Sequence, residues 1–473
     1  MFIDSKFHND IKIKPKDINS DFIYLFNKPG PYYSSYPTLN EWKKSKDNFR
    51  YEDALKEYFL ENPNNPIYLY LHIPYCAKLC YYCSCRMHIS NNRETINDFV
   101  KILIKECNML EVFFRTNNIK PNIKEIHLGG GTPSHLTVDE LTQVINNLKK
   151  FIDIEKLQEF SMEIDPRTVS FENFDHYAAL GIDRISFGVQ DFDLDVQKKI
   201  NRVQPFELIE TLMREEIKKK FKGVNFDLLY GLPGQTLETF RKTIKLTKVL
   251  APERITLIKY AHIPNKRKHM KMIKEEDFPD DKDLPYMFVE SAQSLIDGGY
   301  SWVGIDHFAK KNDQLAIAKD KGKVYRNFGG ETPGFTKDII CLGPSSTSSF
   351  GRNYTQSTYD LHEYRNKIRE GIFPISKSYV LSNDDIIRRD CNFELQCNQR
   401  LYTNKINKKY NINFSDYFSK EVIKLKELER KGLLSYTDNL ITVTTVGRYL
   451  VRHICRIFDK FIDDNSAYEV HGN

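Results

Sequence analysis

Six short apolar segments alternate with longer amphipathic segments between residues 67 and 262, and this alternation restricts the fold more than any other feature. The candidate strands cover 67–73, 123–128, 159–164, 184–189, 224–230 and 254–260. The intervening segments 94–114, 138–151 and 237–250 repeat apolar residues at helical spacing. Strand–helix alternation predicts a parallel sheet of the α/β class, and six units predict an open, partial (β/α)6 barrel.

Thiols, glycines and carboxylates follow these strands. The first strand runs into HIPYCAKLCYYCSC, the second is followed by GGGTP, and the third ends in Glu163 and Asp165. The last three strands lead to Gln190, Asp227 and Ala261. In barrel-type folds the carboxyl ends of the strands form the active-site face. We therefore expect all of these groups on one face of the sheet.

Three regions flank the predicted barrel, which covers 61–280. Residues 1–60 form an N-terminal arm with the turn GPYYSSYPT, 281–380 form a mixed α/β extension, and 381–473 form a mostly helical C-terminal cap domain. A helix–strand–turn–strand–helix pattern at 425–458 also fits a winged helix. The net charge is only +6 and no basic stripe marks a recognition helix, so nucleic acid is not an expected partner and the helical cap is favoured.

Four of the nine cysteines fall within ten residues: Cys76, Cys80, Cys83 and Cys85. Thiolates spaced C-x3-C-x2-C can ligate three irons of a cubane [4Fe–4S] cluster and leave the fourth iron open. The alternative is a zinc site with Cys85 as the fourth ligand, although zinc sites usually pair two knuckles separated in sequence. A set of merely buried cysteines fits the polar segment YCSCR poorly. The spacing favours the cluster.

The segment GGGTP at 129–133 lies between a predicted strand and a predicted helix. Its glycines allow backbone amides to approach a ligand closely, and Thr132 adds a hydroxyl. Polar side chains at or near the later strand ends suit ribose hydroxyls and amino-acid termini, although each alone is as easily a surface or capping residue: Glu163, Gln190, Arg202 and Asp227.

The N-terminus, MFIDSKFHND, has neither a signal-peptide pattern nor an Arg-rich transit pattern. No apolar run is long enough to cross a bilayer. We expect a cytoplasmic monomer without a membrane span, whose cysteines form no disulfide framework.

The motifs HIPYCAKLCYYCSC, LGGGTP, MEIDPR, RISFGVQDF, NFDLLYGLP, KYAHIP, GIDHFA and RRD occur in the order seen in oxygen-independent coproporphyrinogen III oxidases, a branch of the radical S-adenosylmethionine (SAM) superfamily. The chain resembles this family from about residue 30 to residue 459. The resemblance implies an oxidoreductase of porphyrin and heme biosynthesis with a [4Fe–4S] cluster and two molecules of SAM. In the family, a 5′-deoxyadenosyl radical takes hydrogen from two propionates of coproporphyrinogen III, which lose CO2 and become the vinyl groups of protoporphyrinogen IX. The implied partners are this tetrapyrrole and an unidentified electron donor and acceptor.

The resemblance also implies roles for individual residues. The cluster ligands are Cys76, Cys80 and Cys83. One SAM contacts Tyr70, Gly130 and Glu163. The second SAM contacts Gly131, Thr132, Gln190, Arg202, Asp227 and Ala261. Tyr82 stands where an aromatic residue also contacts SAM, and Thr347 stands where an isoleucine contacts SAM.

Three positions depart from the family pattern. Tyr32 replaces the arginine of GPRYTSYPT, Gly329 replaces the glutamine of NFQGY, and Thr347 replaces the isoleucine of GxSAI. These changes keep a second reading open, a paralogue that acts on another substrate, such as a methyltransferase or a heme-modifying enzyme. A heme-binding chaperone is a third reading, but such relatives typically lack the cysteine at position 85 and the N-terminal arm.

Overall fold

The computed structural model of the chain describes residues 13, 18–44 and 49–462. Its centre is a 13-stranded sheet in the order β1-β17-β16-β15-β14-β2-β5-β6-β7-β8-β9-β11-β10. The middle strands pair in parallel and in chain order: β2 (Pro66–Ile73), β5 (Asn122–Gly130), β6 (Glu159–Ile164), β7 (Arg184–Gln190), β8 (Gly223–Tyr230) and β9 (Arg254–Lys259). The six predicted strands therefore form, and the prediction of a partial (β/α)6 barrel is confirmed.

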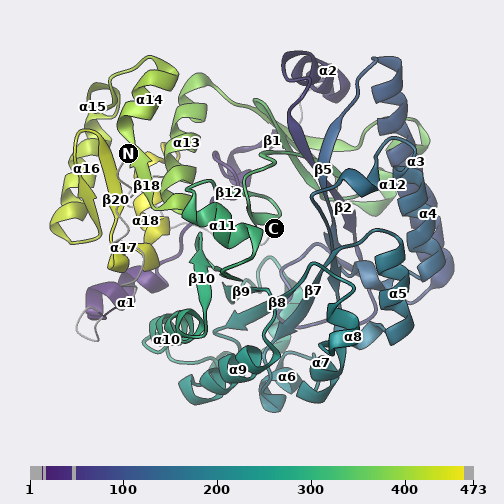
Figure 1. Ribbon diagram of the computed structural model, residues 1–473, viewed down its shortest axis with the longest axis horizontal. Coiled ribbons are helices and arrows are strands. Elements are labelled where there is room, and N and C mark those ends of the chain that lie inside the picture. Colours follow the sequence, from purple (N-terminus) through teal and green to yellow (C-terminus); the bar gives the residue numbers. More distant parts are fainter. Residues whose placement is uncertain (1–12, 14–17, 45–48, 463–473) are drawn as a thin grey trace.

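Helices connect these strands and cover the outer face of the curved sheet (Figure 1). They are α3 (Arg93–Thr116), α4 (Val138–Leu148), α5 (Phe171–Ala179), α6 (Leu194–Lys199), α7 (Phe206–Leu212), α8 (Glu215–Lys218), α9 (Leu237–Leu250) and α10 (Leu284–Asp297). The predicted helix 237–250 has the bounds of α9, whereas the helix predicted over 138–151 ends at Leu148. A capping box between Thr137 and Glu140 satisfies amides at the start of α4.

Strands from the predicted extension, together with one strand of the arm at 43–44, lengthen the sheet at both edges. Next to β9 lie β11 (His307–Lys310) and β10 (Tyr300–Val303), which are antiparallel. Next to β2 lies the parallel β14 (Asp338–Leu342), followed by antiparallel β15 (Thr347–Phe350), β16 (Asn353–Ser357), β17 (Ile375–Val380) and β1 (Lys43–Lys44). The remaining elements of the extension are α11 (Gln314–Asp320), β12 (Tyr325–Asn327), β13 (Gly330–Thr332) and α12 (Leu361–Arg369).

The C-terminal region and α1 (Ser20–Asn27) of the arm pack beside the β10 edge, whereas α2 (Tyr51–Glu61) of the arm lies beside α3 on the other side of the sheet (Figure 1). The described part of the arm contains α1 (Ser20–Asn27) and α2 (Tyr51–Glu61), and the loop 75–89 contains the short strands β3 (Tyr75–Cys76) and β4 (His88–Ile89). The C-terminal region contains α13 (Asn383–Asn398), β18 (Arg400–Tyr402), α14 (Thr403–Tyr410), α15 (Phe414–Tyr417), α16 (Ser419–Arg430), β19 (Leu434–Tyr436), β20 (Leu440–Val443), α17 (Thr445–Tyr449) and α18 (Val451–Cys455). The pattern expected at 425–458 is thus present. Residues 1–12, on which the expectation about targeting partly rests, lie outside the described residues.

No helix in the described ranges is both long enough and apolar enough to cross a membrane. The nine cysteines, all of which are described, form no disulfide.

A buried ionic network closes the amino end of the barrel. Glu159, Arg184 and Arg254 begin β6, β7 and β9, and Asp313 precedes α11. Arg184 lies 2.9 Å from Glu159 and 3.0 Å from Asp313, and Arg254 lies 3.1 Å and 2.9 Å from the same two carboxylates. Two positive and two negative charges therefore neutralise each other at largely buried positions, with side-chain exposures of 4–23%.

We expect Asp313→Ala to lower the free energy of unfolding by about 3–5 kcal/mol, because it leaves two buried guanidinium groups with one carboxylate. Asp195→Ala is the matched control: its partner Lys198 is 59% exposed and Asp195 is 82% exposed, so the loss should stay below about 1 kcal/mol. Urea unfolding followed by circular dichroism measures both. Equal losses in the two variants would contradict the stabilising role of the network.

Candidate functional site

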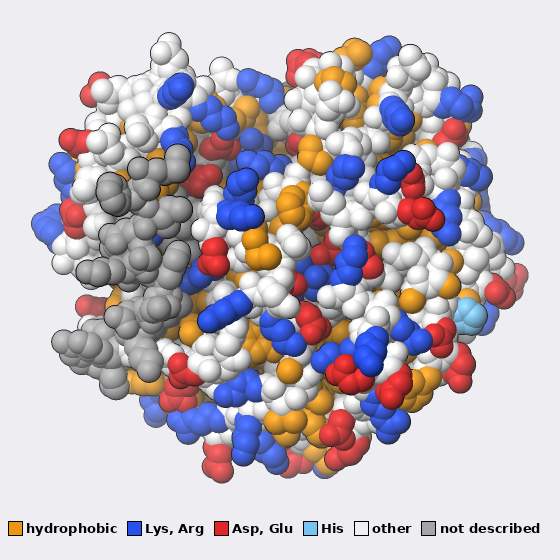
Figure 2. Space-filling model, viewed as in Figure 1, with side chains coloured by type: hydrophobic (Ala, Val, Ile, Leu, Met, Phe, Trp, Pro, Cys, Tyr) orange, Lys and Arg blue, Asp and Glu red, His pale blue; other side chains and the backbone are white. Residues whose placement is uncertain are grey.

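A cavity of ≈ 620 Å³ runs along the inside of the barrel, from the ionic network to the carboxyl ends of the strands. Most of the residues singled out in the sequence line it: Cys76, Cys80, Tyr82, Cys83, Gly130, Gly131, Thr132, Glu163, Gln190, Arg202, Asp227 and Ala261. On the face shown in Figure 2, basic and acidic side chains are intermixed, and no stripe of one sign crosses it.

The loop that carries the cysteines is held by backbone contacts to the end of α6. The amide of Tyr81 donates to the carbonyl of Ile200 at 3.0 Å, and the Asn201 side chain donates to the carbonyl of Leu79 at 2.7 Å. Within the loop, the amide of Cys83 donates to the carbonyl of Cys80 at 3.2 Å. The tight turn brings the second and third cysteines to the same wall of the cavity.

Hydrogen-bond donors surround two of the three sulfurs. The Thr132 hydroxyl lies 3.1 Å from Cys76 Sγ, and the guanidinium groups of Arg167 and Arg202 each lie 3.5 Å from Cys80 Sγ. Cationic donors stabilise sulfur in its thiolate form. Three thiols on one cavity wall, with these donors beside them, fit an anionic iron–sulfur cluster.

The first and third cysteines differ in their electrostatic surroundings. Burial raises the pKa of the Cys76 thiol to about 12. The Cys85 thiol hydrogen-bonds to Cys83 and, with Arg202 and Arg267, lowers the pKa of Cys83 to about 7 against the effect of burial. Cys85 thus acts on a candidate ligand through a hydrogen bond.

The glycine segment lies directly against the cysteine loop. Gly131 donates its amide to the carbonyl of Ile73 at 2.7 Å, and a Cβ at Gly131 would lie 2.7 Å from the carbonyl oxygen of Pro74. Gly130 has a φ of 115° and donates its amide to Glu163 Oε2 at 3.1 Å. Only residues without a side chain allow this close approach, so Glu163 and the glycine backbone share one corner of the cavity.

Gln190 and Arg202 meet at a bulge near the end of β7. The register with β8 shifts between Gly188 and Gln190, whose φ is 65°. Arg202 donates to the carbonyl of Gly188 at 2.8 and 3.1 Å and lies 3.2 Å from Asp165. Burial opposes the charge of Asp165, but Arg202 and Arg167 outweigh it and lower its pKa to about 2. One guanidinium group thus connects the bulge, a carboxylate and a cysteine.

Asp227 lies on the same wall and accepts hydrogen bonds from Ser186 and Asn225, both at 2.9 Å. Burial raises the pKa of its carboxyl group. Glu163 accepts from His127 Nε2 at 3.3 Å. These carboxylates face the cavity with acceptor capacity left for ligand hydroxyls or amines.

Two predicted site residues do not line the cavity. The Tyr70 hydroxyl bonds His72 Nδ1 at 3.2 Å, and its ring stacks on His127 with centroids 5.7 Å apart. Thr347 lies in β15, where its carbonyl accepts from the Cys341 thiol at 2.7 Å. Tyr70 therefore contacts the side chains that orient Glu163, whereas Thr347 lies farther from them in the sheet.

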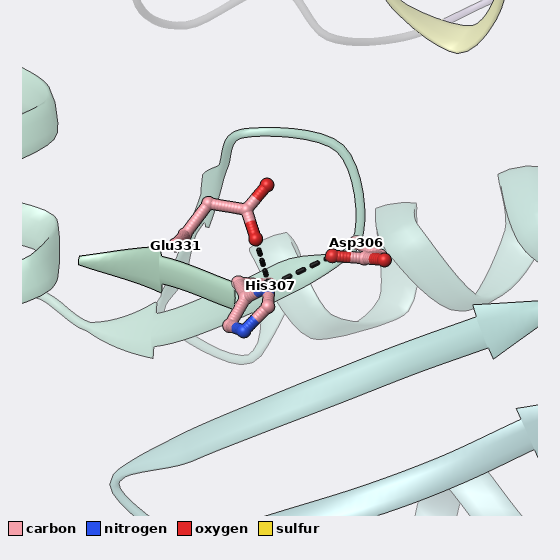
Figure 3. Close-up of side chains that lie close together, drawn as sticks. All are labelled: Asp306, His307 and Glu331. Atoms are coloured by element: carbon pink, nitrogen blue, oxygen red, sulfur yellow. Dashed lines mark hydrogen bonds and ion pairs between the residues drawn. The ribbon is translucent and has the colours of Figure 1, made fainter. Parts of the chain in front are cut away.

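Sequence reasoning missed a charged cluster that lines the cavity, formed by Arg326 together with Asp306, His307 and Glu331, the last three of which are drawn in Figure 3. His307 Nδ1 lies 2.7 Å from Asp306 and 2.6 Å from Glu331, and Arg326 pairs with both carboxylates. Burial opposes a charge on His307, but the carboxylates of Glu331 and Asp306 raise its pKa to about 10. The motif GIDHFA contains Asp306 and His307, but only the fold shows that Glu331 joins them.

The potential ligand atoms of Asp306, His307 and Glu331 lie within 4.8 Å of one another, a spacing that would also suit a metal ion. Arg326 and a protonated His307 already balance the two carboxylates, so the cluster is neutral as it stands. We interpret it as an ion-paired wall that holds the His307 imidazole against the cavity.

His307→Gln should lower the free energy of unfolding by about 3–5 kcal/mol at pH 6, because it removes one cation from a buried cluster. The folded-state pKa of about 10 lies above the ordinary value near 6.5. The stabilisation is therefore complete below about pH 6.5 and is lost as the pH rises through about 10. Urea unfolding at pH 6, 8 and 10 should show the gap between wild type and variant shrinking. His176→Gln, at an exposed position, serves as control; a constant gap for His307→Gln would show that His307 is neutral.

Known proteins match both the sequence and the fold. The family model described as the radical SAM superfamily matches residues 70–247. The oxygen-independent coproporphyrinogen III oxidase of Salmonella typhimurium is 34% identical over 440 residues, covering 93% of this chain and 94% of the relative. That of Helicobacter pylori is 36% identical over 444 residues, covering 92% and 95%.

A solved structure, coproporphyrinogen III oxidase from Escherichia coli, described as a radical SAM enzyme, matches with a TM-score of 0.86 at 34% identity. The match covers 91% of this chain and 98% of that chain. Identity at this level over nearly the whole length, together with the shared fold, means that the chain belongs to the oxygen-independent coproporphyrinogen III oxidase family of the radical SAM superfamily.

Proposed function

We propose that this chain converts coproporphyrinogen III to protoporphyrinogen IX without oxygen, by oxidative decarboxylation of two propionates. The observation that carries the proposal is the convergence of the three-cysteine loop, the glycine segment and the carboxylates of β6 and β8 on one cavity. Near full-length identity to curated oxidases supports the choice of substrate.

Membership of the superfamily implies a [4Fe–4S] cluster and SAM, which together supply a 5′-deoxyadenosyl radical when bound. We assign the cluster to Cys76, Cys80 and Cys83, whose sulfurs face the cavity wall with Thr132, Arg167 and Arg202 beside them. The match to the radical SAM superfamily model over residues 70–247 favours the cluster over the zinc alternative.

We assign one SAM to Glu163 and the amide side of Gly130, with Tyr70 acting through His127. A second SAM is assigned to residues on the β5, β7, β8 and β9 ends: Gly131, Thr132, Gln190, Arg202, Asp227 and Ala261. Tyr82 would cover one of the two. The family resemblance also assigns Thr347 to SAM, and this contact would use the backbone atoms of Thr347. The carboxylates suit the amino group and ribose hydroxyls of this cofactor, and Arg202 suits its carboxylate.

The chemistry asked of the substrate is the same at both propionates. Each side chain gives up one hydrogen atom from its β-carbon, one electron and CO2, and is left as a vinyl group. The barrel walls keep water from the carbon-centred radical. The guanidinium groups of Arg167 and Arg202 offer donors to anionic groups. We propose an electron donor and a separate acceptor of the last electron, neither of them identified, a monomeric enzyme, and a cytoplasmic location.

One observation favours a second candidate, a paralogue with another substrate. Tyr32 and Gly329, two of the three departures from the family pattern, both line the cavity. A Cβ at Gly329 would lie 3.0 Å from the Tyr68 hydroxyl, so a glutamine at this position would crowd that hydroxyl.

Cysteine variants test the cluster assignment. Cys80→Ser should abolish the broad iron–sulfur absorbance and all cleavage of SAM, because it removes a ligand. Cys85→Ser is the matched variant on the same loop and should retain the absorbance. Loss of metal in both variants, with zinc in the wild type, would support the zinc site instead. Anaerobic absorbance spectra, metal analysis and 5′-deoxyadenosine release measure these outcomes.

Turnover tests the substrate. Protein reconstituted anaerobically with iron and sulfide, then given reductant, SAM, an electron acceptor and coproporphyrinogen III, should yield porphyrins lighter by one and then two oxidative decarboxylations. Mass spectrometry follows the porphyrin and 5′-deoxyadenosine together. Deoxyadenosine without any change in the tetrapyrrole would retain the radical enzyme but reject this substrate in favour of the paralogue.

A further inference from the structure

Two cations lie beside the cavity without an acidic partner. Lys259 ends β9, lines the cavity and donates to the neutral Asn27 side chain at 2.7 Å. Arg452 of α18 donates to the carbonyl of Gly30 at 3.2 Å. Within the described ranges, neither side chain has an ion-pair partner. By contrast, each arginine that lines the cavity pairs with a carboxylate: Arg184, Arg202, Arg254 and Arg326.

Tyr32 contacts Arg452, which in turn is a charged neighbour of Lys259. The Arg452 guanidinium lies over the Tyr32 ring, 4.5 Å from its centroid, and Lys259 lies 5.2 Å from the centroid of Phe26 in α1. Tyr32 lines the cavity, and its hydroxyl forms no hydrogen bond within the described part of the chain. Three donors from the arm, the barrel and the C-terminal region therefore lack an anionic acceptor.

Such an arrangement is costly unless an anion completes it. Burial, and then the neighbouring Arg452, lower the pKa of Lys259 to about 8, so the amine is still largely protonated at neutral pH. Uncompensated like charges in a partly buried site destabilise the protein, and a bound anion removes that cost. The nearby carboxylates cannot serve, because Asp306 and Glu331 are already paired with Arg326 and His307. Asp281, the other acidic neighbour of Lys259, is exposed.

We propose that Lys259, Arg452 and the Tyr32 hydroxyl form a subsite for a carboxylate, and that its occupant is a propionate of the tetrapyrrole substrate. This inference rests on the proposed function. SAM also has a carboxylate, but Arg202, the cation assigned to it, lies beside Cys80 and Asp165, whereas Tyr32 has Arg452, Asp306, Arg326 and Glu331 as its charged neighbours. Because the substrate has four carboxylates, some of them must be bound away from the cluster. Lys259 and Arg452 supply cations for one of them.

The subsite also offers a role for the tyrosine at position 32, where this chain departs from the family pattern. The family pattern has an arginine there, and this chain has a neutral phenol. The positive charge on this side of the cavity comes from Lys259 of β9 and Arg452 of α18. We expect the subsite to anchor a propionate rather than to react with it, because an ion pair stabilises the carboxylate in the ground state and so opposes loss of CO2.

Binding of coproporphyrin III, the oxidised and air-stable form of the substrate, tests the proposal. Fluorescence anisotropy with the reconstituted holoenzyme should give a Kd about tenfold higher for Lys259→Gln and about twofold to fivefold higher for Tyr32→Phe, as expected for a charged and a neutral hydrogen bond respectively. Lys259→Arg, which keeps the charge, should stay within about threefold of wild type. Lys282→Gln removes the same charge from an exposed, ion-paired lysine nearby and should change nothing.

Turnover and SAM binding separate the possible outcomes. Lys259→Gln should raise KM for coproporphyrinogen III about tenfold with kcat largely retained, and the Kd for SAM and the iron–sulfur absorbance should not change. A weaker affinity for SAM with unchanged porphyrin binding would assign the carboxylate to SAM and overturn the proposal. Equal losses in Lys259→Gln and Lys282→Gln would show diffuse attraction rather than a site, and would also overturn it.

The carboxylate subsite and the proposed function can be refuted separately. If the wild type turns over coproporphyrinogen III and Lys259→Gln binds coproporphyrin III as tightly as wild type, the subsite is refuted and the proposed function stands. If the wild type produces deoxyadenosine but neither binds coproporphyrin III nor changes its reduced form, both the subsite and the proposed function are refuted.

Discussion

The parallel hydrogen bonding of β2, β5, β6, β7, β8 and β9 is the constraint on which the rest of this protein depends. Parallel pairing in chain order puts six strand ends at one edge, so that loops far apart in the sequence share a cavity. Arg202 illustrates the result: it follows β7, yet it donates to Cys80 from the loop after β2 and pairs with Asp165 after β6. Without the sheet, no local interaction would bring a thiol, a guanidinium and a carboxylate together.

Charge balance divides the cavity into three parts. At the amino end, Arg184 and Arg254 neutralise Glu159 and Asp313, and this part of the cavity is structural. On the β11 side, Arg326 and His307 neutralise Asp306 and Glu331. Between the arm and α18, Lys259 and Arg452 have no ion-pair partner among the residues that the structure describes. Because burying charge is favourable only with a partner, the unbalanced part is where an anionic ligand contributes most to stability.

The three departures from the family pattern differ in their expected effect on ligand binding, because they lie at different places in the fold. Thr347 lies within the sheet and engages Cys341 through its carbonyl, so a change of side chain there leaves the contact intact. Gly329 and Tyr32 lie on the cavity wall, where a lost amide and a lost charge change what a ligand meets. Glu331 lies two residues after Gly329 and creates an ionic cluster with His307 that the sequence comparison did not single out.

The sequence by itself determined the six strands, the helices between them and the identity of the cysteine loop, because apolar periodicity and C-x3-C-x2-C spacing are local properties that survive without knowledge of the fold. It also indicated which face would carry the ligands, since residues at strand ends share an edge in any parallel sheet. Only the tertiary structure decided that Tyr70 acts behind the cavity wall, that Glu331 joins Asp306 and His307, and that Arg452 lies over Tyr32 and near Lys259. These contacts join residues separated by tens to hundreds of positions, and whether a charge is balanced depends on partners that no local pattern specifies.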